Sequence, residues 1–157
     1  MTKEKFSVID GRLNMVVGFM FTPDRSRVVL IKKLRPTWQV GLLNGVGGRV
    51  REGEPPMQAM IREFEEETGV REENWESLCA LKFKKGLIYF YYTFSNQAMD
   101  VKTMESEEVR TWDASLLYML KTVSNLQWLI PMVLELSDVE KNYSESGRAM
   151  VISCSTK

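Results

Sequence analysis

The amino-acid sequence predicts an α/β fold in which helices flank a mixed β-sheet, and three observations lead to this prediction. Apolar, β-branched runs over residues 13–21 and 27–33 are typical of two strands, and the TPDRS sequence between them supplies a turn. Aromatic-rich runs over 75–85 and 87–95 predict a second hairpin that turns near KKG. Residues 56–68 have the apolar spacing of an amphipathic helix. Because strands outnumber helices, the helices can cover the faces of one sheet.

The first hairpin and the predicted helix are separated by a glycine-rich segment, which we expect to form a loop, a short strand and a second loop. The helix itself has apolar residues at i, i+3, i+4 and i+7, namely Met57, Met60, Ile61 and Phe64. Pro56 at its start and Gly69 at its end are the residues that such a helix prefers at these positions. We therefore predict a helix over 56–68.

The C-terminal third predicts one more strand and two helical segments. The sequence EEVRTWD favours a short strand, and SLLYMLK and NLQWLIPMVLEL have helical apolar spacing, with Pro131 either early in the second helix or kinking it. The last dozen residues fit a small strand or a tail. With 157 residues, 44% of them hydrophobic, we expect a single domain over 1–157.

The charge balance and the amino-acid composition exclude or disfavour several classes of function. Lys+Arg and Asp+Glu are both 21, so no net positive charge favours duplex nucleic acid or an acidic membrane. No apolar run is long enough for a membrane span, and the two cysteines, Cys79 and Cys154, lie far apart, so we expect reduced thiols and a cytoplasmic location. The chain has no histidine, which excludes histidine-based catalytic triads and disfavours zinc. Any metal chemistry must depend on carboxylates.

The stretch REFEEETGV places Glu63, Glu66 and Glu67 on one face of the predicted helix, roughly opposite the apolar stripe. Like charges at this spacing destabilise an ordinary helix by about 0.2–0.5 kcal/mol per pair. A hard cation such as Mg²⁺, or Mn²⁺ in its place, prefers oxygen ligands, and its positive charge would offset the repulsion between the carboxylates. Glu65 is expected to point away from this face as a solvated residue.

Two neighbouring features complete the candidate site. Arg62 lies one turn before Glu66, so it can form an ion pair there and can hold the loop that carries Gly48 and Glu54. The glycines before the helix leave backbone groups accessible next to a helix N-terminus, a place that favours phosphate. The carbonyl of Gly47 is a candidate additional metal ligand.

Read as G-x5-E-x7-R-E-U-x-E-E-x-G-U, with U apolar, this stretch resembles the signature of the Nudix family. The matching residues are Gly48, Glu54, Arg62, Glu63, Phe64, Glu66, Glu67, Gly69 and Val70. The resemblance implies the Nudix α/β/α sandwich with a mixed sheet. It also implies metal-dependent hydrolysis of a nucleoside diphosphate linked to a group X.

The resemblance implies roles for single residues as well. Glu66 and Glu67 are expected to bind the metal, with Glu63 as ligand or base and Arg62 in an orienting role. A further acidic residue after the signature often contributes, and we prefer Glu108 over its neighbours Glu105 and Glu107. A solvated acidic loop is the alternative for each of these three.

The segment KKLRPTWQVGLLNGVGGRV resembles that of MutT-type enzymes, which hydrolyse nucleoside triphosphates, including oxidised purine forms, to the monophosphate and pyrophosphate. This resemblance implies that Asn44 and Asn125 contact the base, and an amide can do so bidentately. The alternatives are a left-handed turn residue for Asn44 and a helix N-cap for Asn125. Lys32 and Lys33 are candidate triphosphate contacts, along with Gly48 near the phosphates; a solvated strand end is the alternative for the lysines.

Other interpretations stay open. The same chemistry could act on a nucleotide sugar, ADP-ribose, a dinucleoside polyphosphate or capped RNA. A non-catalytic, nucleotide-sensing Nudix module is the alternative of another class. In each case the expected partner is a small-molecule nucleotide rather than duplex nucleic acid or a membrane, and the protein is a monomer or a homodimer.

Overall fold

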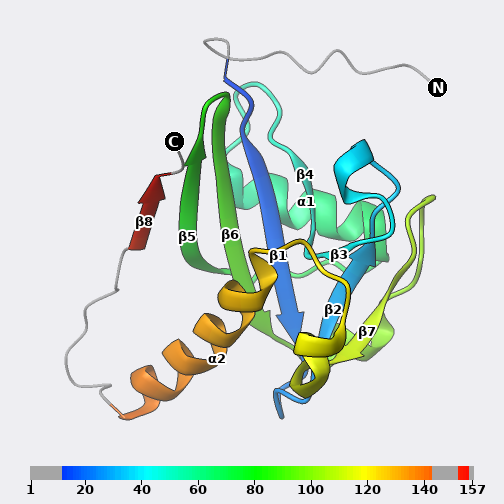
Figure 1. Cartoon of the computed structure of the whole chain (residues 1–157), viewed down its shortest axis with the longest axis vertical. Coiled ribbons are helices and arrows are strands. Elements are labelled where there is room, and N and C mark those ends of the chain that lie inside the picture. Colours follow the sequence, from blue (N-terminus) through cyan, green and yellow to red (C-terminus); the bar gives the residue numbers. More distant parts are fainter. Residues whose placement is uncertain (1–11, 143–151, 156–157) are drawn as a thin grey trace.

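The computed structural model describes residues 12–142 and 152–155. Its strands and α-helices, in chain order, are β1 (Met15–Phe21), β2 (Arg27–Lys32), β3 (Leu43–Asn44), β4 (Val46–Arg49), α1 (Pro56–Thr68), β5 (Glu76–Phe83), β6 (Gly86–Phe94), β7 (Val109–Asp113), α2 (Leu126–Asn142) and β8 (Ile152–Ser155). The short 3₁₀ helices η2 (Thr37–Gln39), η3 (Asn96–Asp100) and η4 (Ala114–Met119) lie in the connections. The arrangement of these elements is shown in Figure 1.

The sheet is mixed, as predicted. Strand β1 runs parallel to β6 from Met15 opposite Ile88 to Phe21 opposite Phe94. On its other side β1 pairs antiparallel with β4 along its first half, and with β2 only where Phe21 faces Val28. Strand β2 pairs antiparallel with β3 and β7, and β5 pairs antiparallel with β6 and parallel with β8. The second hairpin is therefore confirmed, whereas the first is paired only near its turn, because β4 lies beside the start of β1.

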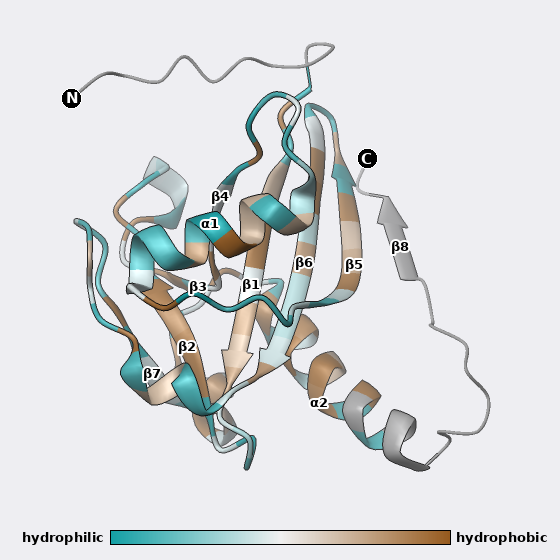
Figure 2. Cartoon of the chain, turned by 180° about the vertical axis from the view of Figure 1, so that it is seen from behind, coloured by the Kyte–Doolittle hydropathy of each residue, from teal (hydrophilic) through white to brown (hydrophobic). Residues whose placement is uncertain are grey.

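Helices α1 and α2 lie on opposite faces of this sheet, which confirms the predicted sandwich (Figures 1 and 2). Alternate residues of β1 face the two helices, as the pleat of a strand requires. Val16 and Met20 belong to the core cluster that contains the apolar side of α1. Val17 and Phe19 belong to the cluster that contains the buried residues of α2. Both faces of β1 are therefore packed, which explains why its sequence is apolar throughout.

The C-terminal part differs from expectation in one element. SLLYMLK forms the 3₁₀ helix η4 instead of an α-helix, and only Leu117 of this helix is buried. The side chain of Asp113 accepts a hydrogen bond from the Ser115 amide at its start, which fixes a short turn. Pro131 lies inside α2. Part of the last dozen residues forms strand β8, while 146–151, 156 and 157 lie outside the described residues.

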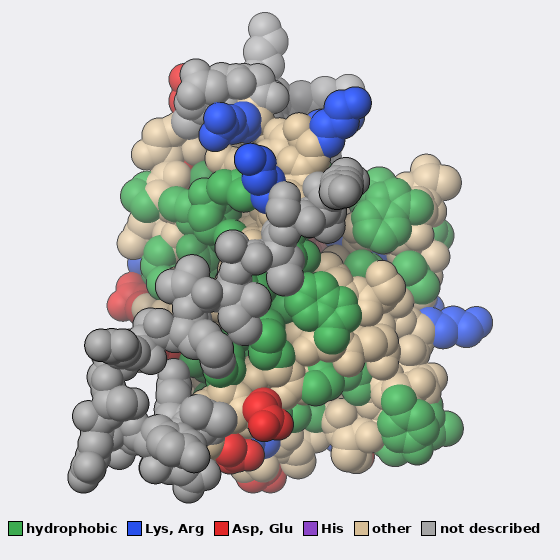
Figure 3. Space-filling view, turned by 60° about the vertical axis from the view of Figure 1, so that its left-hand side comes forward, with side chains coloured by type: hydrophobic (Ala, Val, Ile, Leu, Met, Phe, Trp, Pro, Cys, Tyr) green, Lys and Arg blue, Asp and Glu red, His purple; other side chains and the backbone are tan. Residues whose placement is uncertain are grey.

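The surface carries scattered apolar side chains. Figure 3 shows them in separate groups on one face, with basic side chains mainly toward its upper end and acidic ones toward its lower end. No helix in the part of the chain that the structure describes is long and apolar enough to cross a membrane.

Candidate active site

Two glycines of β4 allow close approaches, Gly48 from helix α1 and Gly47 from strand β1. A Cβ atom on Gly48 would lie 2.3 Å from the carboxyl carbon of Glu63, and one on Gly47 would lie 1.9 Å from the carbonyl oxygen of Val16 on β1. Any larger residue at Gly48 would therefore displace the Glu63 carboxylate. At the other end of α1, Gly69 has a φ of 76° and ends the helix in the left-handed conformation that glycine adopts most easily.

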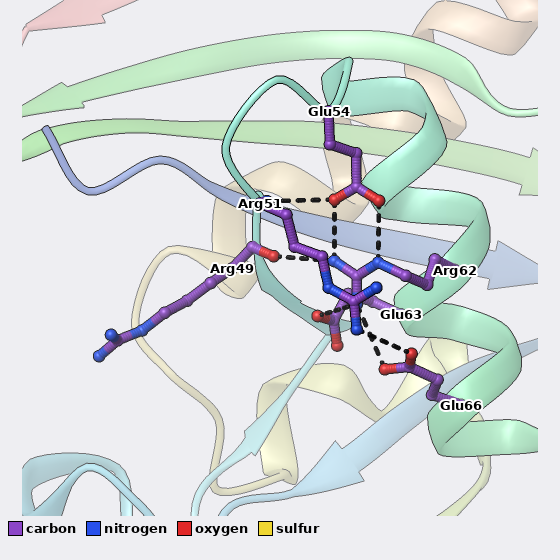
Figure 4. Close-up of polar contacts among 6 residues, drawn as sticks. All are labelled: Arg49, Arg51, Glu54, Arg62, Glu63 and Glu66. Atoms are coloured by element: carbon purple, nitrogen blue, oxygen red, sulfur yellow. Dashed lines mark hydrogen bonds and ion pairs between the residues drawn. The ribbon is translucent and has the colours of Figure 1, made fainter. Parts of the chain in front are cut away.

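Arg62 is the centre of an ion-pair network at the start of this face (Figure 4). Its Nε and Nη2 atoms each donate to a different oxygen of Glu54 at 2.9 Å, a bidentate arrangement, and Nη2 also donates to the Arg49 carbonyl at 3.0 Å. Its Nη1 atom contacts Glu63 at 2.7 Å and Glu66 at 3.3 Å. These contacts hold the loop before α1 against the helix, as the sequence predicted.

The pKa values of two partners of Arg62, Glu54 and Glu63, are shifted in opposite directions. The hydrogen bond from Arg62 lowers the pKa of Glu54 below its ordinary value of 4.5. Burial raises the pKa of Glu63 above that value, although Arg62 opposes this shift. Glu63 is thus held close to a guanidinium group and still disfavours a negative charge.

Glu67 lies in the most unfavourable environment for a carboxylate in this group. The residue is 8% exposed, and its Oε2 atom is buried with no hydrogen-bond partner in the described residues. Burial, followed by the charges of Glu105, Glu107 and Glu63, raises its pKa to about 7. The prediction that this acidic face lies opposite the apolar stripe is wrong for Glu63 and Glu67, because both side chains are largely buried beside it.

Two other glutamates of the helix behave differently. The Glu66 side chain is 42% exposed and contacts Arg51 at 3.6 Å as well as Arg62. Glu65 is 46% exposed and pairs with Arg71 at 3.1 Å, which confirms that it points away from the acidic face. The glutamates of α1 therefore separate into an inner pair, Glu63 and Glu67, the partly exposed Glu66, and the outer Glu65.

The acidic segment after the signature contributes residues other than the one we preferred. The charge of Glu105 acts on both Glu63 and Glu67, so it lies close to the acidic face. Glu107 is buried and accepts from Lys33 Nζ at 2.9 Å and from the Leu34 amide at 2.6 Å. The structure does not bring Glu108 to this group: its side chain is 58% exposed and pairs with Arg110. All three glutamates lie in an irregular segment before β7, where no periodicity in the sequence indicates which side chain points inward.

The donor set of this face fits a hard divalent cation. All its side-chain donors are carboxylate oxygens, and one of them, Glu67 Oε2, is buried without a partner in the described part of the chain. Glu63 and Glu66 are occupied by Arg62, and no three acidic side chains among the described residues already converge as metal ligands. A cation would thus satisfy Glu67 directly, and would compete with Arg62 for Glu63 and Glu66.

The two candidate base-binding amides differ in their hydrogen bonding. Asn44 belongs to β3, donates to Gln39 Oε1 at 3.2 Å and accepts from the Gly45 amide at 2.8 Å. It does not have a positive φ, so its interpretation as a left-handed turn residue is wrong. The Oδ1 atom of Asn125 is buried and accepts no hydrogen bond from the described residues, so its side chain does not cap α2.

The two lysines at the end of β2 diverge. Lys33 pairs with buried Glu107, and its charge acts on Glu67. Lys32 is exposed and lines a surface pocket with Glu108 and Trp112. Of the two lysines, Lys33 alone is therefore close to the acidic face.

Comparison with known proteins decides the family. The NUDIX domain model matches residues 12–128, which includes the acidic face and the whole sheet except β8. The chain belongs to the Nudix family. Proteins of this family are hydrolases that act on pyrophosphate bonds, and they generally use divalent cations.

Solved structures share the Nudix fold with this chain. A MutT structure described for Aliivibrio salmonicida and Vibrio cholerae has a TM-score of 0.67 at 24% identity and covers 80% of this chain and 98% of its own. The Nudix domain of Shewanella oneidensis NrtR, complexed with ADP ribose, has a TM-score of 0.64 at 19% identity, over 87% and 94% of the two chains. MutT of Burkholderia pseudomallei gives 0.65 at 20% identity, over 78% and 98%. No curated protein matches the chain.

Proposed function

We propose that the protein is a Mg²⁺-dependent hydrolase, with Mn²⁺ as a substitute, that converts nucleoside triphosphates to the monophosphate and pyrophosphate. The metal assignment rests on the buried Oε2 atom of Glu67, which has no hydrogen-bond partner in the described residues. The charges of other carboxylates act on the same side chain. In a Nudix protein, a buried carboxylate oxygen of this kind is best explained as a ligand of a bound cation. A bound divalent ion supplies charge neutralisation on the phosphate oxygens and on the departing phosphate.

The residues of the chain have distinct proposed roles. Glu63, Glu66 and Glu67 hold the ion, with the Gly47 carbonyl as a further oxygen donor. Arg62 keeps Glu63 and Glu66 in place through contacts at 2.7 and 3.3 Å. Glu63 or Glu105 receives the proton of the attacking water, and Glu105 is favoured over Glu108 because its charge reaches the acidic face.

The proposed substrate is a purine nucleoside triphosphate, oxidised forms included. Asn125 supports this assignment, because its buried Oδ1 is an acceptor without a donor in the described residues and a purine amine would supply one. Asn44 is the second proposed base contact, and Lys33 and the Gly48 backbone are proposed contacts to the triphosphate. ADP-ribose is the second candidate, because the Nudix domain of NrtR that resembles this chain was solved with that molecule.

The test is a substrate panel run with the parent and the Glu66→Gln variant, in Mg²⁺ and in Mn²⁺. We expect the parent to release pyrophosphate from nucleoside triphosphates and the variant to be inactive with an unchanged circular dichroism spectrum. Glu65→Gln is the matched control, since Glu65 points away from the face and pairs with Arg71. Full activity in Glu66→Gln would contradict the metal assignment.

The products of the panel distinguish the alternatives. Release of two phosphate monoesters, AMP and ribose 5-phosphate, would favour ADP-ribose as the substrate. Release of a nucleoside monophosphate together with a nucleoside di- or triphosphate would favour a dinucleoside polyphosphate. Tight nucleotide binding without turnover at saturating metal would favour a sensing module over an enzyme.

A further inference from the structure

The surface pocket that Lys32 lines lies away from the acidic face. It has a volume of about 220 Å³, and its walls come from β2, β3, β7 and the segment after η4. Its lining residues are Lys32, Gly41, Leu43, Glu108, Arg110, Trp112, Met119, Leu120 and Lys121. Val28 and Leu30 of β2 pack on the α2 side of the sheet, and Lys32 continues their alternation. The pocket therefore lies on the opposite side of β2 from Glu67.

The backbone around this pocket is fixed by hydrogen bonds between distant segments. The Lys32 amide donates to the Glu108 carbonyl at 2.8 Å, and the Leu43 amide donates to the Lys121 carbonyl at 2.8 Å. The Val123 amide donates to the Leu43 carbonyl at 2.9 Å. Lys32 and Lys121 thus extend from backbone positions that hydrogen bonds hold in place.

The charge of the pocket is positive. It contains three cations, Lys32, Arg110 and Lys121, and one carboxylate, Glu108, so its net charge is +2. Glu108 already contacts Arg110 at 3.3 Å. Lys32 and Lys121 form no ion pair within the described part of the chain. Two ammonium groups at one pocket therefore lack a counter-charge among these residues.

The remaining wall is largely apolar. The guanidinium of Arg110 lies over the ring of Trp112 at 4.0 Å from its centroid, and Leu43, Met119 and Leu120 complete this wall. An apolar wall next to two ammonium groups that form no ion pair with the described residues favours a ligand that has an anionic group and an apolar part.

We propose that this pocket is a second ligand site, which binds the phosphate group of a small phosphate monoester and packs part of the ester's apolar or planar body on Trp112, Met119 and Leu120. A phosphate monoester carries about −1.5 to −2 charges at pH 7, which matches the net charge of the pocket. The pocket is smaller than the ~300–1,000 Å³ of sites that enclose a whole ligand, so it holds the phosphate end and leaves the rest at the surface. Lys32 then serves this pocket and not the triphosphate of the substrate.

The experiment measures binding of phenyl phosphate, inorganic phosphate and phenol to the full chain by titration calorimetry in excess EDTA. Without divalent metal, the outcome does not depend on the proposed hydrolysis. We expect phenyl phosphate to bind more tightly than inorganic phosphate, phenol not to bind, and the affinity to fall as ionic strength rises. Lys121→Met and Arg110→Ala should each weaken phenyl phosphate binding about tenfold, the effect of losing one charge-assisted contact.

Two controls make the result specific. Lys102→Met removes an exposed lysine elsewhere, and Glu66→Gln alters the acidic face; both should leave phenyl phosphate binding unchanged. Equal binding by the parent and by the Arg110→Ala, Lys121→Met double variant would overturn the proposal, as would no binding by a folded parent. Inorganic phosphate binding as tightly as phenyl phosphate would overturn the role of the apolar wall.

Discussion

At the scale of single residues, the environment of Glu67 makes a prediction about stability. Burial and neighbouring carboxylates raise its pKa from 4.5 to about 7, so the folded state binds more protons than the unfolded state between these pH values. The contribution of Glu67 to the free energy of unfolding therefore falls as the pH rises through this window. In EDTA, Glu67→Gln should match the parent near pH 4.5 and exceed its stability by about 1–3 kcal/mol at about pH 8.

Urea denaturation at both pH values measures this difference. Saturating Mg²⁺ supplies the control, because it should stabilise the parent through binding to the native state and stabilise the variant less. A variant that is no more stable than the parent at the higher pH, without metal, would mean that Glu67 is not under electrostatic strain.

Gly48 allows a second test at this scale, because its φ is not in the left-handed region and alanine could adopt its backbone conformation. The added Cβ would lie 2.3 Å from the Glu63 carboxyl carbon, so Glu63 must move away from Arg62. We expect Gly48→Ala to reduce kcat about 100-fold, as a misplaced catalytic group does, with little loss of fold.

Gly53→Ala is the matched control for this substitution. Gly53 has a φ of +72°, and a Cβ atom there would have no neighbour within 4 Å, so alanine is strained at this position but contacts nothing in the described residues. It should lower stability by about 1 kcal/mol and leave kcat unchanged. If the two variants had the same kinetics, close approach of Glu63 to β4 would not matter for the reaction.

Some residues of the site could be predicted from the sequence, whereas others could not. Glu63, Glu66 and Arg62 share one helix, so helical spacing alone brings them together, and the structure agrees. Glu105 and Glu108 lie in an irregular segment before a strand, where no period says which side chain points inward. The burial of Glu67 also escaped prediction, because it depends on packing against that same segment.

At the scale of elements, buried Glu107 connects the end of β2 and the following loop to the segment before β7. Its carboxylate contacts Lys33 and the Leu34 amide at 2.9 and 2.6 Å. Glu107→Ala would leave the largely buried Lys33 charge unpaired, so we expect a loss of about 3–5 kcal/mol in the free energy of unfolding. Amide hydrogen exchange should become faster at Leu34 and at the loop that follows.

Glu108→Ala provides the comparison for stability. Glu108 is the next residue, but both partners of its ion pair with Arg110 are more than half exposed, and such pairs contribute about 0–1 kcal/mol. Equal destabilisation by the two substitutions would contradict the anchoring role of Glu107.

Among the elements, α1 was predicted with its observed bounds, because Pro56 and Gly69 limit it chemically at both ends. SLLYMLK lacks such a limit: its apolar spacing fits an α-helix, yet the chain turns back after six residues of 3₁₀ helix. The next residues then pair with β3, where Leu43 exchanges hydrogen bonds with Lys121 and Val123. This long-range pairing with β3 determines the conformation of SLLYMLK, and the apolar spacing of the segment itself does not predict it.

At the scale of the whole molecule, the strands could be predicted but not their order. Strand β1 pairs in parallel with β6, although β2, β3, β4, α1 and β5 lie between them in the sequence. No local sequence pattern specifies this pairing. The α/β/α sandwich was predicted from the resemblance to the Nudix signature, and the packing of α1 and α2 on opposite faces of the sheet confirms it. In this arrangement, Gly48 of β4 lies directly against the Glu63 carboxylate of α1.

In the proposed reaction the carboxylates of α1 hold a divalent cation against a diphosphate, and titration calorimetry measures that binding. Mg²⁺ and Mn²⁺ are titrated into the full chain, with and without a non-hydrolysable nucleoside triphosphate, and into Glu67→Gln as the control. We expect the parent to take up metal, the affinity to rise when nucleotide is present, and the affinity to be about tenfold or more lower in the variant. No uptake of either metal by the folded parent, even with nucleotide present, would contradict it.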